Sequence, residues 1–191
     1  PLHTRGNAAF FGILGYELDL GDLLPVEERE IRAQIAFYKK HRQTFQFGAF
    51  TRLPADEGCT AWQVKGKKET AAGYFTRLVR AAPGYERVRF AGLDPNGSYR
   101  VETRPRALRV GDFGGLIKYV SPVRISVNGP LLRTADRHFT MPDGGAAFTA
   151  SGRALMWGFS PAPRFTGTGY DKAARNQGDF SSELYIAAED K

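Results

Sequence analysis

The sequence predicts a mainly β protein: an antiparallel β-sandwich over residues 49–191, preceded by one strand and one helix of the kind that repeats in a (β/α)₈ barrel. Three observations predict this class. Residues 8–20 are almost continuously apolar, residues 25–47 show apolar side chains at helical spacing, and short runs rich in Thr, Val, Phe and Tyr recur after Gly48. Because a single strand and helix cannot close a barrel, residues 1–48 are interpreted as its truncated end.

The first strand is predicted over Phe10–Leu20, because its apolar run suits a strand buried on both faces of a parallel sheet. A helix is predicted to begin at Pro25, whose fixed φ suits a first helical position. Glutamates follow Pro25, and basic residues occupy Lys39–Arg42, as the helix dipole favours. An apolar stripe runs along this segment, and Gly48 ends it.

The β-sandwich is predicted from short strands separated by turns. Asp94–Gly97 and Pro142–Gly145 are predicted turns, and Phe113–Val120 is either a short helix or an insertion. The predicted strands are Phe50–Leu53, Thr60–Val64, Thr70–Arg80, Arg87–Ala91, Ser98–Glu102, Val123–Val127, Ala147–Thr149 and Ser182–Ile186.

The composition excludes several classes of function. The net charge is +7, but basic residues occur in ones and twos, and Lys65–Lys68 is better explained as a solvated hairpin turn. We therefore expect no nucleic-acid partner. No run approaches the roughly 20 apolar residues of a membrane span, so no membrane partner is expected. Cys59 is the only cysteine, which rules out an intramolecular disulfide and a cysteine-based zinc site and favours a reducing, cytoplasmic compartment.

A series of motifs runs along nearly the whole chain: Gly15–Leu20, Gln34–Arg42, Phe47–Leu53, Thr60–Val64, Gly92–Pro95, Tyr99–Val101, Phe165–Tyr170, Gly178–Ser182 and Leu184–Tyr185. In content and order these motifs resemble the end of glycoside hydrolase family 36, the α-galactosidases. Residues 103–148 match this pattern less distinctly, and Met156-Trp157-Gly158 departs from the small polar residues expected there.

The resemblance implies an enzyme with an N-terminal β-supersandwich, a catalytic (β/α)₈ barrel and a C-terminal β-sandwich. Such an enzyme hydrolyses terminal α-linked galactose from oligosaccharides with retention of configuration. This chain would then hold the last strand and helix of the catalytic barrel in residues 1–48 and the sandwich in residues 49–191. Its expected partners are the rest of the barrel and further copies in a homo-oligomer, and no cofactor is expected.

A retaining glycosidase needs two carboxylates about 5–5.5 Å apart. In the family that the chain resembles, both are aspartates on earlier barrel strands, one of them within a Lys-Trp-Asp motif. No Lys-Trp-Asp occurs in this sequence. We therefore expect no catalytic residue in this chain, and its substrate-binding residues remain unknown. The predicted function is that of a catalytically inert, structural C-terminal fragment of an α-galactosidase; the alternative is a carbohydrate-binding β-sandwich module for galactosides.

The chain offers one carboxylate pair of its own. Glu17 and Asp19 would face the same side of the predicted strand, roughly 6.5–7 Å apart. A solvated or hydrogen-bonded strand end is the favoured explanation, because a barrel site needs loops from several strands.

The remaining candidates have simpler explanations than catalysis or binding. The histidines His3, His41 and His138 show no metal-ligand spacing, so no metal site is expected, and His41 is interpreted as a partner of the helix dipole. Gly167–Gly169 lacks the ending of a phosphate loop, and Cys59 lacks a base partner. Five aromatic residues could stack on sugar rings, but core packing is the favoured explanation: Trp62, Tyr74, Phe75, Trp157 and Tyr170.

Overall fold

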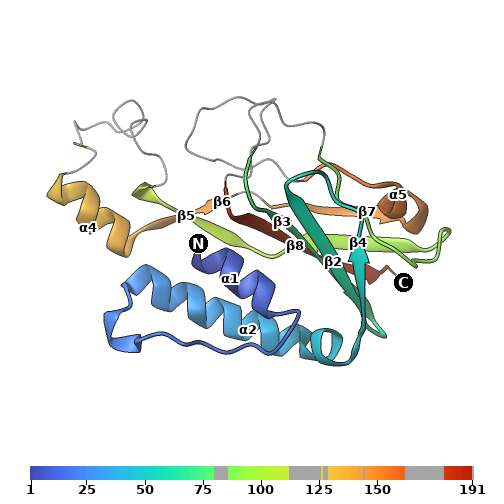
Figure 1. The fold of residues 1–191 in the computed structure, drawn as a ribbon, viewed down its shortest axis with the longest axis horizontal. Coiled ribbons are helices and arrows are strands. Elements are labelled where there is room, and N and C mark those ends of the chain that lie inside the picture. Colours follow the sequence, from blue (N-terminus) through green and yellow to red (C-terminus); the bar gives the residue numbers. More distant parts are fainter. Residues whose placement is uncertain (80–85, 112–125, 127–128, 144, 162–178, 191) are drawn as a thin grey trace.

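The computed structural model describes residues 1–79, 86–111, 126, 129–143, 145–161 and 179–190 (Figure 1). Its helical elements are α1 (Leu2–Ala9), the 3₁₀ helix η1 (Leu20–Asp22), α2 (Pro25–Phe47), α4 (Pro130–His138) and α5 (Gly152–Trp157). Its strands are β1 (Ala49–Leu53), β2 (Cys59–Lys65), β3 (Glu69–Thr76), β4 (Ser98–Thr103), β5 (Arg106–Arg109), β6 (Thr140–Asp143), β7 (Ala147–Ser151) and β8 (Ser181–Glu189).

Six of these strands form one sheet in the order β1-β2-β3-β8-β4-β7, and every neighbouring pair is antiparallel. The last strand, β8, lies between β3 and β4 in the middle of this sheet. Strands β5 and β6 form a separate antiparallel pair. The predicted class, a mainly β fold with an antiparallel C-terminal sheet domain, is confirmed.

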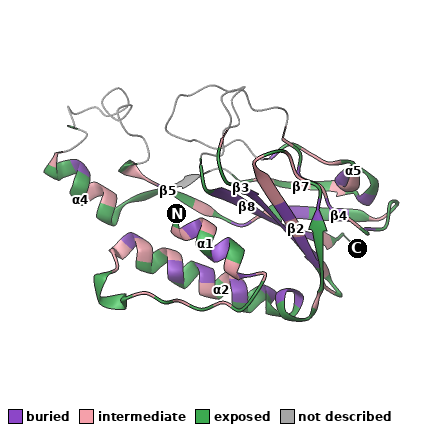
Figure 2. Cartoon of the chain, in the orientation of Figure 1, coloured by how far each residue is buried: buried purple, intermediate pink, exposed green. Residues whose placement is uncertain are grey.

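The middle of the sheet, β3 and β8, is buried on both faces, and alternate side chains of β8 contact the two faces (Figure 2). Leu184 and Ile186 pack with Phe10 and aromatic residues of α2, whereas Tyr185 and Ala187 join a second apolar cluster on the opposite face. In Figure 1, α1 and α2 lie together below the sheet, and α5 lies beyond its other side. We call these the α2 face and the α5 face.

The predicted strand over Phe10–Leu20 is wrong. The chain instead opens with α1, and an irregular segment runs from the end of α1 to η1. Phe10 is fully buried against the rings of Phe37, Tyr38 and Phe45, with ring centroids 5.5 to 5.8 Å apart. The apolar run therefore reflects packing against α2 and the sheet, rather than a place inside a parallel sheet.

The helix predicted from Pro25 to the residue before Gly48 is confirmed by α2. Its first turn is capped by Glu27, whose carboxylate accepts a hydrogen bond from the Leu24 amide at 3.0 Å. Gly48 is required at its end, because a Cβ there would lie 2.4 Å from Val64 Cγ1. A tight turn at this glycine leads α2 directly into the sheet.

Most strands predicted in the described residues are confirmed within a few residues of their ends, as is the Asp94–Gly97 turn, where the Gly97 amide donates to the Asp94 carbonyl. The strand expected at Arg87–Ala91 is reduced to one bridge between Val88 and Phe159. The helix or insertion at 113–120 lies outside the described residues, as does the strand at 123–127 apart from residue 126.

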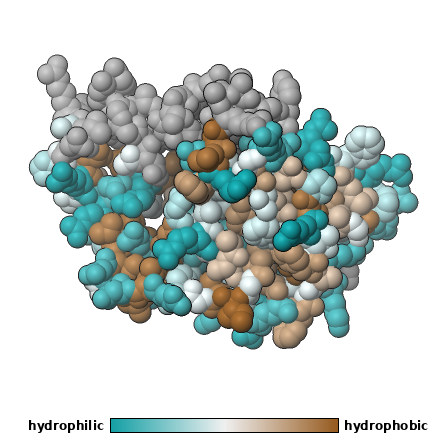
Figure 3. Space-filling view, in the orientation of Figure 1, coloured by the Kyte–Doolittle hydropathy of each residue, from teal (hydrophilic) through white to brown (hydrophobic). Residues whose placement is uncertain are grey.

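The surface of the described residues mixes hydrophilic and hydrophobic side chains (Figure 3). Several large apolar side chains are solvent-exposed, including Ile13 at 94%, Phe47 at 74% and Trp157 at 73%. No helix among the described residues is long and apolar enough to span a membrane.

Candidate functional site

A buried cluster of polar side chains connects α1 and α2 to the α2 face of the sheet. We call this cluster the polar joint, and it consists of His3, Asn7, Glu30, Gln34, Arg104 and Ser182. The Arg104 side chain is only 3% exposed, and its Nη2 donates to Glu30 Oε1 at 2.5 Å. Its Nη1 donates to Asn7 Oδ1 at 2.8 Å and lies 2.8 Å from His3 Nδ1. Arg104 directly follows β4, so its guanidinium group connects both helices to the end of that strand.

The amides of the polar joint extend these contacts. Asn7 Nδ2 donates to Ser182 Oγ on β8 at 2.9 Å. The fully buried Gln34 donates to Glu30 at 2.8 Å and to the Leu2 carbonyl at 3.1 Å, and it accepts from Tyr16 at 2.7 Å. Because buried polar groups are costly when unpaired, this pairing specifies one position of the two helices against the sheet.

Burial and charge shift two pKa values in the polar joint. Burial, assisted by the charge of Arg104, lowers the pKa of His3 to about 4, against the opposing effect of Glu30. Burial alone would raise the pKa of Glu30, but its hydrogen bonds and the charge of Arg104 prevail and lower it to about 2. At neutral pH the joint therefore holds a neutral imidazole and a charged Glu30–Arg104 pair.

A second polar contact holds the C-terminal part of α2 to the sheet. His41 Nδ1 lies 2.8 Å from Glu69 Oε1, and Thr44 donates to the same oxygen at 2.9 Å. Burial raises the pKa of Glu69, but the hydrogen bonds from His41 and Thr44 outweigh it, so the net shift is downward. The predicted role of His41 as a dipole partner is wrong, because α2 continues to Phe47 and His41 pairs with a carboxylate instead.

The structure places the two sequence-predicted carboxylates outside any strand. Glu17 and Asp19 are both exposed on the irregular segment before η1, so the strand spacing assumed for them does not apply. Asp19 caps η1, with its Oδ1 accepting from the Gly21 amide at 2.8 Å. The favoured explanation, a solvated or hydrogen-bonded strand end, is therefore right about exposure and hydrogen bonding but wrong about the strand.

The three histidines lie in different places. His3 belongs to the polar joint and His41 to the Glu69 contact, while His138 is the exposed last residue of α4. Among the described residues, no group of three or more His, Cys, Asp and Glu side chains could hold a metal ion. Cys59 is the first residue of β2 rather than part of a loop, and its Sγ lies 3.7 Å from Thr76 Oγ1.

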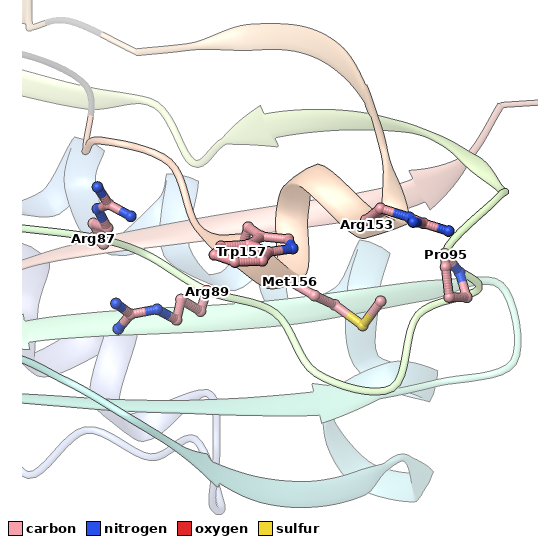
Figure 4. Close-up of a pocket in the computed structure, with 6 residues that line it drawn as sticks. All are labelled: Arg87, Arg89, Pro95, Arg153, Met156 and Trp157. Atoms are coloured by element: carbon pink, nitrogen blue, oxygen red, sulfur yellow. The ribbon is translucent and has the colours of Figure 1, made fainter.

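The aromatic candidates divide into core and surface. Tyr74 and Phe75 are buried on β3, and Trp62 stacks on Phe75 with centroids 4.4 Å apart. Trp157, at the end of α5, is exposed and lies between arginine side chains (Figure 4). Tyr170 and Gly167–Gly169 lie outside the described residues.

A small acidic group lies on the α5 face. Tyr74 donates to Asp56 Oδ2 at 3.0 Å, and the Arg87 amide donates to the same oxygen at 3.2 Å. Burial, together with the charges of Asp56 and Glu183, raises the pKa of Glu86 to about 7. Sequence reasoning missed this group and the polar joint, because their members are far apart in the chain.

Two family profiles match the chain on either side of the α2–β1 turn. The profile of the Glycosyl hydrolase family 36 C-terminal domain matches residues 59–187, and the Melibiase profile matches residues 1–48. The polar joint brings the two matched segments together, since His3, Asn7 and Glu30 belong to one and Arg104 and Ser182 to the other.

Similar proteins are much longer than this chain. Alpha-galactosidase AgaA of Geobacillus stearothermophilus is 38% identical over 118 residues, which are 60% of this chain and 15% of that protein. Alpha-galactosidase Mel36A of Lactobacillus acidophilus is 36% identical over 103 residues, 52% of this chain and 14% of that protein. The crystal structure of the alpha-galactosidase from Lactobacillus brevis matches 98% of this chain and 20% of that chain, with 27% identity and a TM-score of 0.61.

The chain therefore spans about a fifth or less of each of these proteins. The match to the C-terminal domain profile covers more than half of the chain. This chain belongs to glycosyl hydrolase family 36.

Proposed function

We propose that this chain is the C-terminal part of a retaining α-galactosidase whose full-length form hydrolyses terminal α-galactosyl residues of oligosaccharides. In this proposal residues 1–48 are the end of the catalytic barrel, and residues 49–191 are the β-sandwich domain that supports it. The observation that carries the proposal is the pair of adjacent family matches, over residues 1–48 and 59–187, in one chain.

The proposed role of residues 49–191 is structural. The polar joint and the contact of His41 with Glu69 fix α1 and α2 against the sheet, and α2 would in turn support the barrel from which it comes. Exposed apolar side chains near this junction, such as Ile13, Phe47 and Phe50, would be covered by the rest of the barrel. A cytoplasmic location and a homo-oligomer remain part of the proposal.

The chain alone is proposed to be catalytically inert. Retaining hydrolysis needs two carboxylates about 5–5.5 Å apart in a substrate cleft. The candidate pair offered by the sequence, Glu17 and Asp19, is exposed on an irregular segment, and Asp19 serves as a helix cap. The carboxylate of Glu30 is bound to Arg104 and Gln34 within the polar joint.

The test is an assay of the 191-residue chain with p-nitrophenyl α-galactoside, beside a full-length family 36 α-galactosidase as positive control. The expected result is no turnover above buffer for the chain at any concentration at which the control is active. Turnover that scales with chain concentration and survives repurification would overturn the inert role.

The alternative function is a galactoside-binding module. Among the described residues, the exposure of Trp157 favours it, whereas Tyr74 and Phe75 are buried and the half-buried Trp62 stacks on Phe75. Calorimetric titration of the chain with galactose and raffinose tests it, and the absence of heat at millimolar sugar would dispose of it.

A further inference from the structure

The pocket around Trp157 is built on a rigid base. It has a volume of about 570 Å³ and is lined by Arg87, Arg89, Pro95, Arg153, Met156 and Trp157 (Figure 4). This volume falls within the range of about 300–1,000 Å³ that is usual for small-molecule sites.

Backbone hydrogen bonds hold the two halves of the pocket together. The amides of Val88 and Phe159 each donate to the other residue's carbonyl at 2.9 Å, and the Phe90 amide donates to the Leu155 carbonyl at 3.0 Å. The Arg153 amide donates to the Pro95 carbonyl at 3.1 Å. Leu155 is buried in the core, so the backbone of α5 is fixed against the sheet and needs little ordering on binding.

Alternation along residues 87–90 points two arginines outward. Val88 and Phe90 are buried, whereas Arg87 is exposed and Arg89 is partly exposed. Arg153 comes from α5 on the other side of Trp157 (Figure 4). Within the described residues, none of these three guanidinium groups has an ion pair or a side-chain hydrogen bond. Their donors are therefore available to an anionic ligand.

Trp157 supplies the apolar part of the same pocket. Its side chain is 73% exposed, and among the described residues it makes no ring contact. A large exposed indole beside uncompensated arginines has no role in the core of this fold. It offers a flat surface on which the C–H face of a sugar ring can pack, while the ring's polar groups face the arginines.

We propose that this pocket binds an anionic saccharide, with one sugar ring against Trp157 and its carboxylate or sulfate group accepting hydrogen bonds from Arg87 and Arg89. These two arginines lie on the same side of Trp157, and Arg153 lies on the other side (Figure 4), which suits one ring with one anionic group. A nucleic-acid strand needs a longer track of cations and several aromatic platforms. An acidic peptide could pair its carboxylates with the arginines, but its acidic side chains have no flat surface that would pack on the indole.

The site does not depend on the proposed structural role of the chain. The pocket is built on the α5 face, through Leu155, whereas the polar joint and α2 lie on the opposite face of the sheet. Failure of one proposal therefore leaves the other standing.

The test is calorimetric titration of the 191-residue chain with galacturonate and with galactose 6-sulfate, which carry one carboxylate and one sulfate group respectively and the same single negative charge. Raffinose is the neutral comparison, and a short oligothymidylate and an oligoglutamate peptide represent the other ligand classes. We expect saturable binding of at least one anionic sugar and much weaker binding of the other three probes.

Single substitutions test whether the ligand binds in this pocket. Arg87→Gln and Arg89→Gln should each weaken binding about tenfold, as expected for the loss of a charge-assisted hydrogen bond. Trp157→Ala should weaken it by at least as much. The matched control is Arg133→Gln on α4, an exposed arginine with the same change of charge, which should weaken binding less than about twofold. Circular dichroism confirms the fold of each variant.

Several results would overturn the proposal. One is the absence of saturation by either anionic sugar at millimolar concentration. Another is a loss in Arg133→Gln equal to that in Arg89→Gln, since binding would then follow net charge alone. Raffinose, oligothymidylate or oligoglutamate binding as tightly as the anionic sugars would also reject the assignment.

Discussion

Arg104 and Glu30 form a partly buried ion pair, with Nη2 and Oε1 2.5 Å apart, although the two residues are 74 positions apart in the sequence. Arg104 follows β4, and Glu30 lies in the second turn of α2. The pair therefore connects the segment that matches the Melibiase profile to the one that matches the family 36 C-terminal domain. Removing this ion pair should therefore weaken the attachment of one segment to the other.

Arg104→Ala is expected to lower the free energy of unfolding by about 3–5 kcal/mol, because it leaves Glu30 and Asn7 buried without their cationic partner. Urea unfolding followed by circular dichroism measures this loss. The control is Arg32→Ala, which removes an exposed pair with Glu28 and should cost less than about 1 kcal/mol. If Arg104→Ala does not fold, adding Glu30→Gln should partly restore folding, since no uncompensated charge then remains. Equal losses in the two single variants would contradict the prediction.

Stability should fall as the pH is lowered below about 6.5, because the unfolded chain takes up protons at His3 and Glu30 that the folded polar joint does not. Between pH 6.5 and about 4 the unfolded chain protonates His3 but the folded chain does not, and below pH 4.5 the same holds for Glu30 down to about pH 2. His3→Gln should remove the upper part of this loss, about 1–3 kcal/mol, while keeping a side chain that can accept from Arg104. Urea unfolding at pH 7 and pH 4.5 measures the difference. An unchanged pH dependence in His3→Gln would reject the assignment to His3.

Ionisation of Glu86 should lower the stability of the folded chain as the pH rises. Its folded pKa of about 7 lies above the ordinary value of 4.5, so the folded chain binds more protons between these two values. Stability attributable to Glu86 is therefore lost as the pH rises through this window. Glu86→Gln should raise the unfolding free energy at pH 8 by about 1 kcal/mol or less and leave it nearly unchanged at pH 4. Thermal melts at the two pH values test this, and a gain of equal size at both would point to a cause other than charge.

Local patterns in the sequence predicted α2 and most strands of the sheet. Pro25 and Gly48 mark the ends of α2, and alternation with turn residues located β1, β2, β4, β7 and β8 in the described residues. The sheet order was not predictable in this way, because β8 inserts between β3 and β4 from the far end of the chain. The polar joint was missed for the same reason: Asn7 bonds Ser182 across 175 positions, and no local motif marks either residue.

The error at Phe10–Leu20 has a different cause. A continuous apolar run fits a strand buried on both faces and equally fits an irregular segment covered by a helix, and periodicity cannot separate them. Trp157 shows the reverse case: core packing was the favoured explanation for it and is wrong, because its position at the end of α5 leaves it exposed.

The last prediction concerns Phe10–Leu20, the segment for which a strand was predicted. Phe10 is fully buried and packs on Phe37, Tyr38 and Phe45, whereas Ile13, three residues later, is 94% exposed. Phe10→Ala should therefore lower the unfolding free energy by about 3–5 kcal/mol through the cavity it leaves. Ile13→Ala, in the same segment, should change it by less than about 0.5 kcal/mol. A strand buried on both faces would make both substitutions costly, so urea unfolding of the two variants distinguishes the observed packing from the strand. Losses of similar size would show that the segment packs differently in solution.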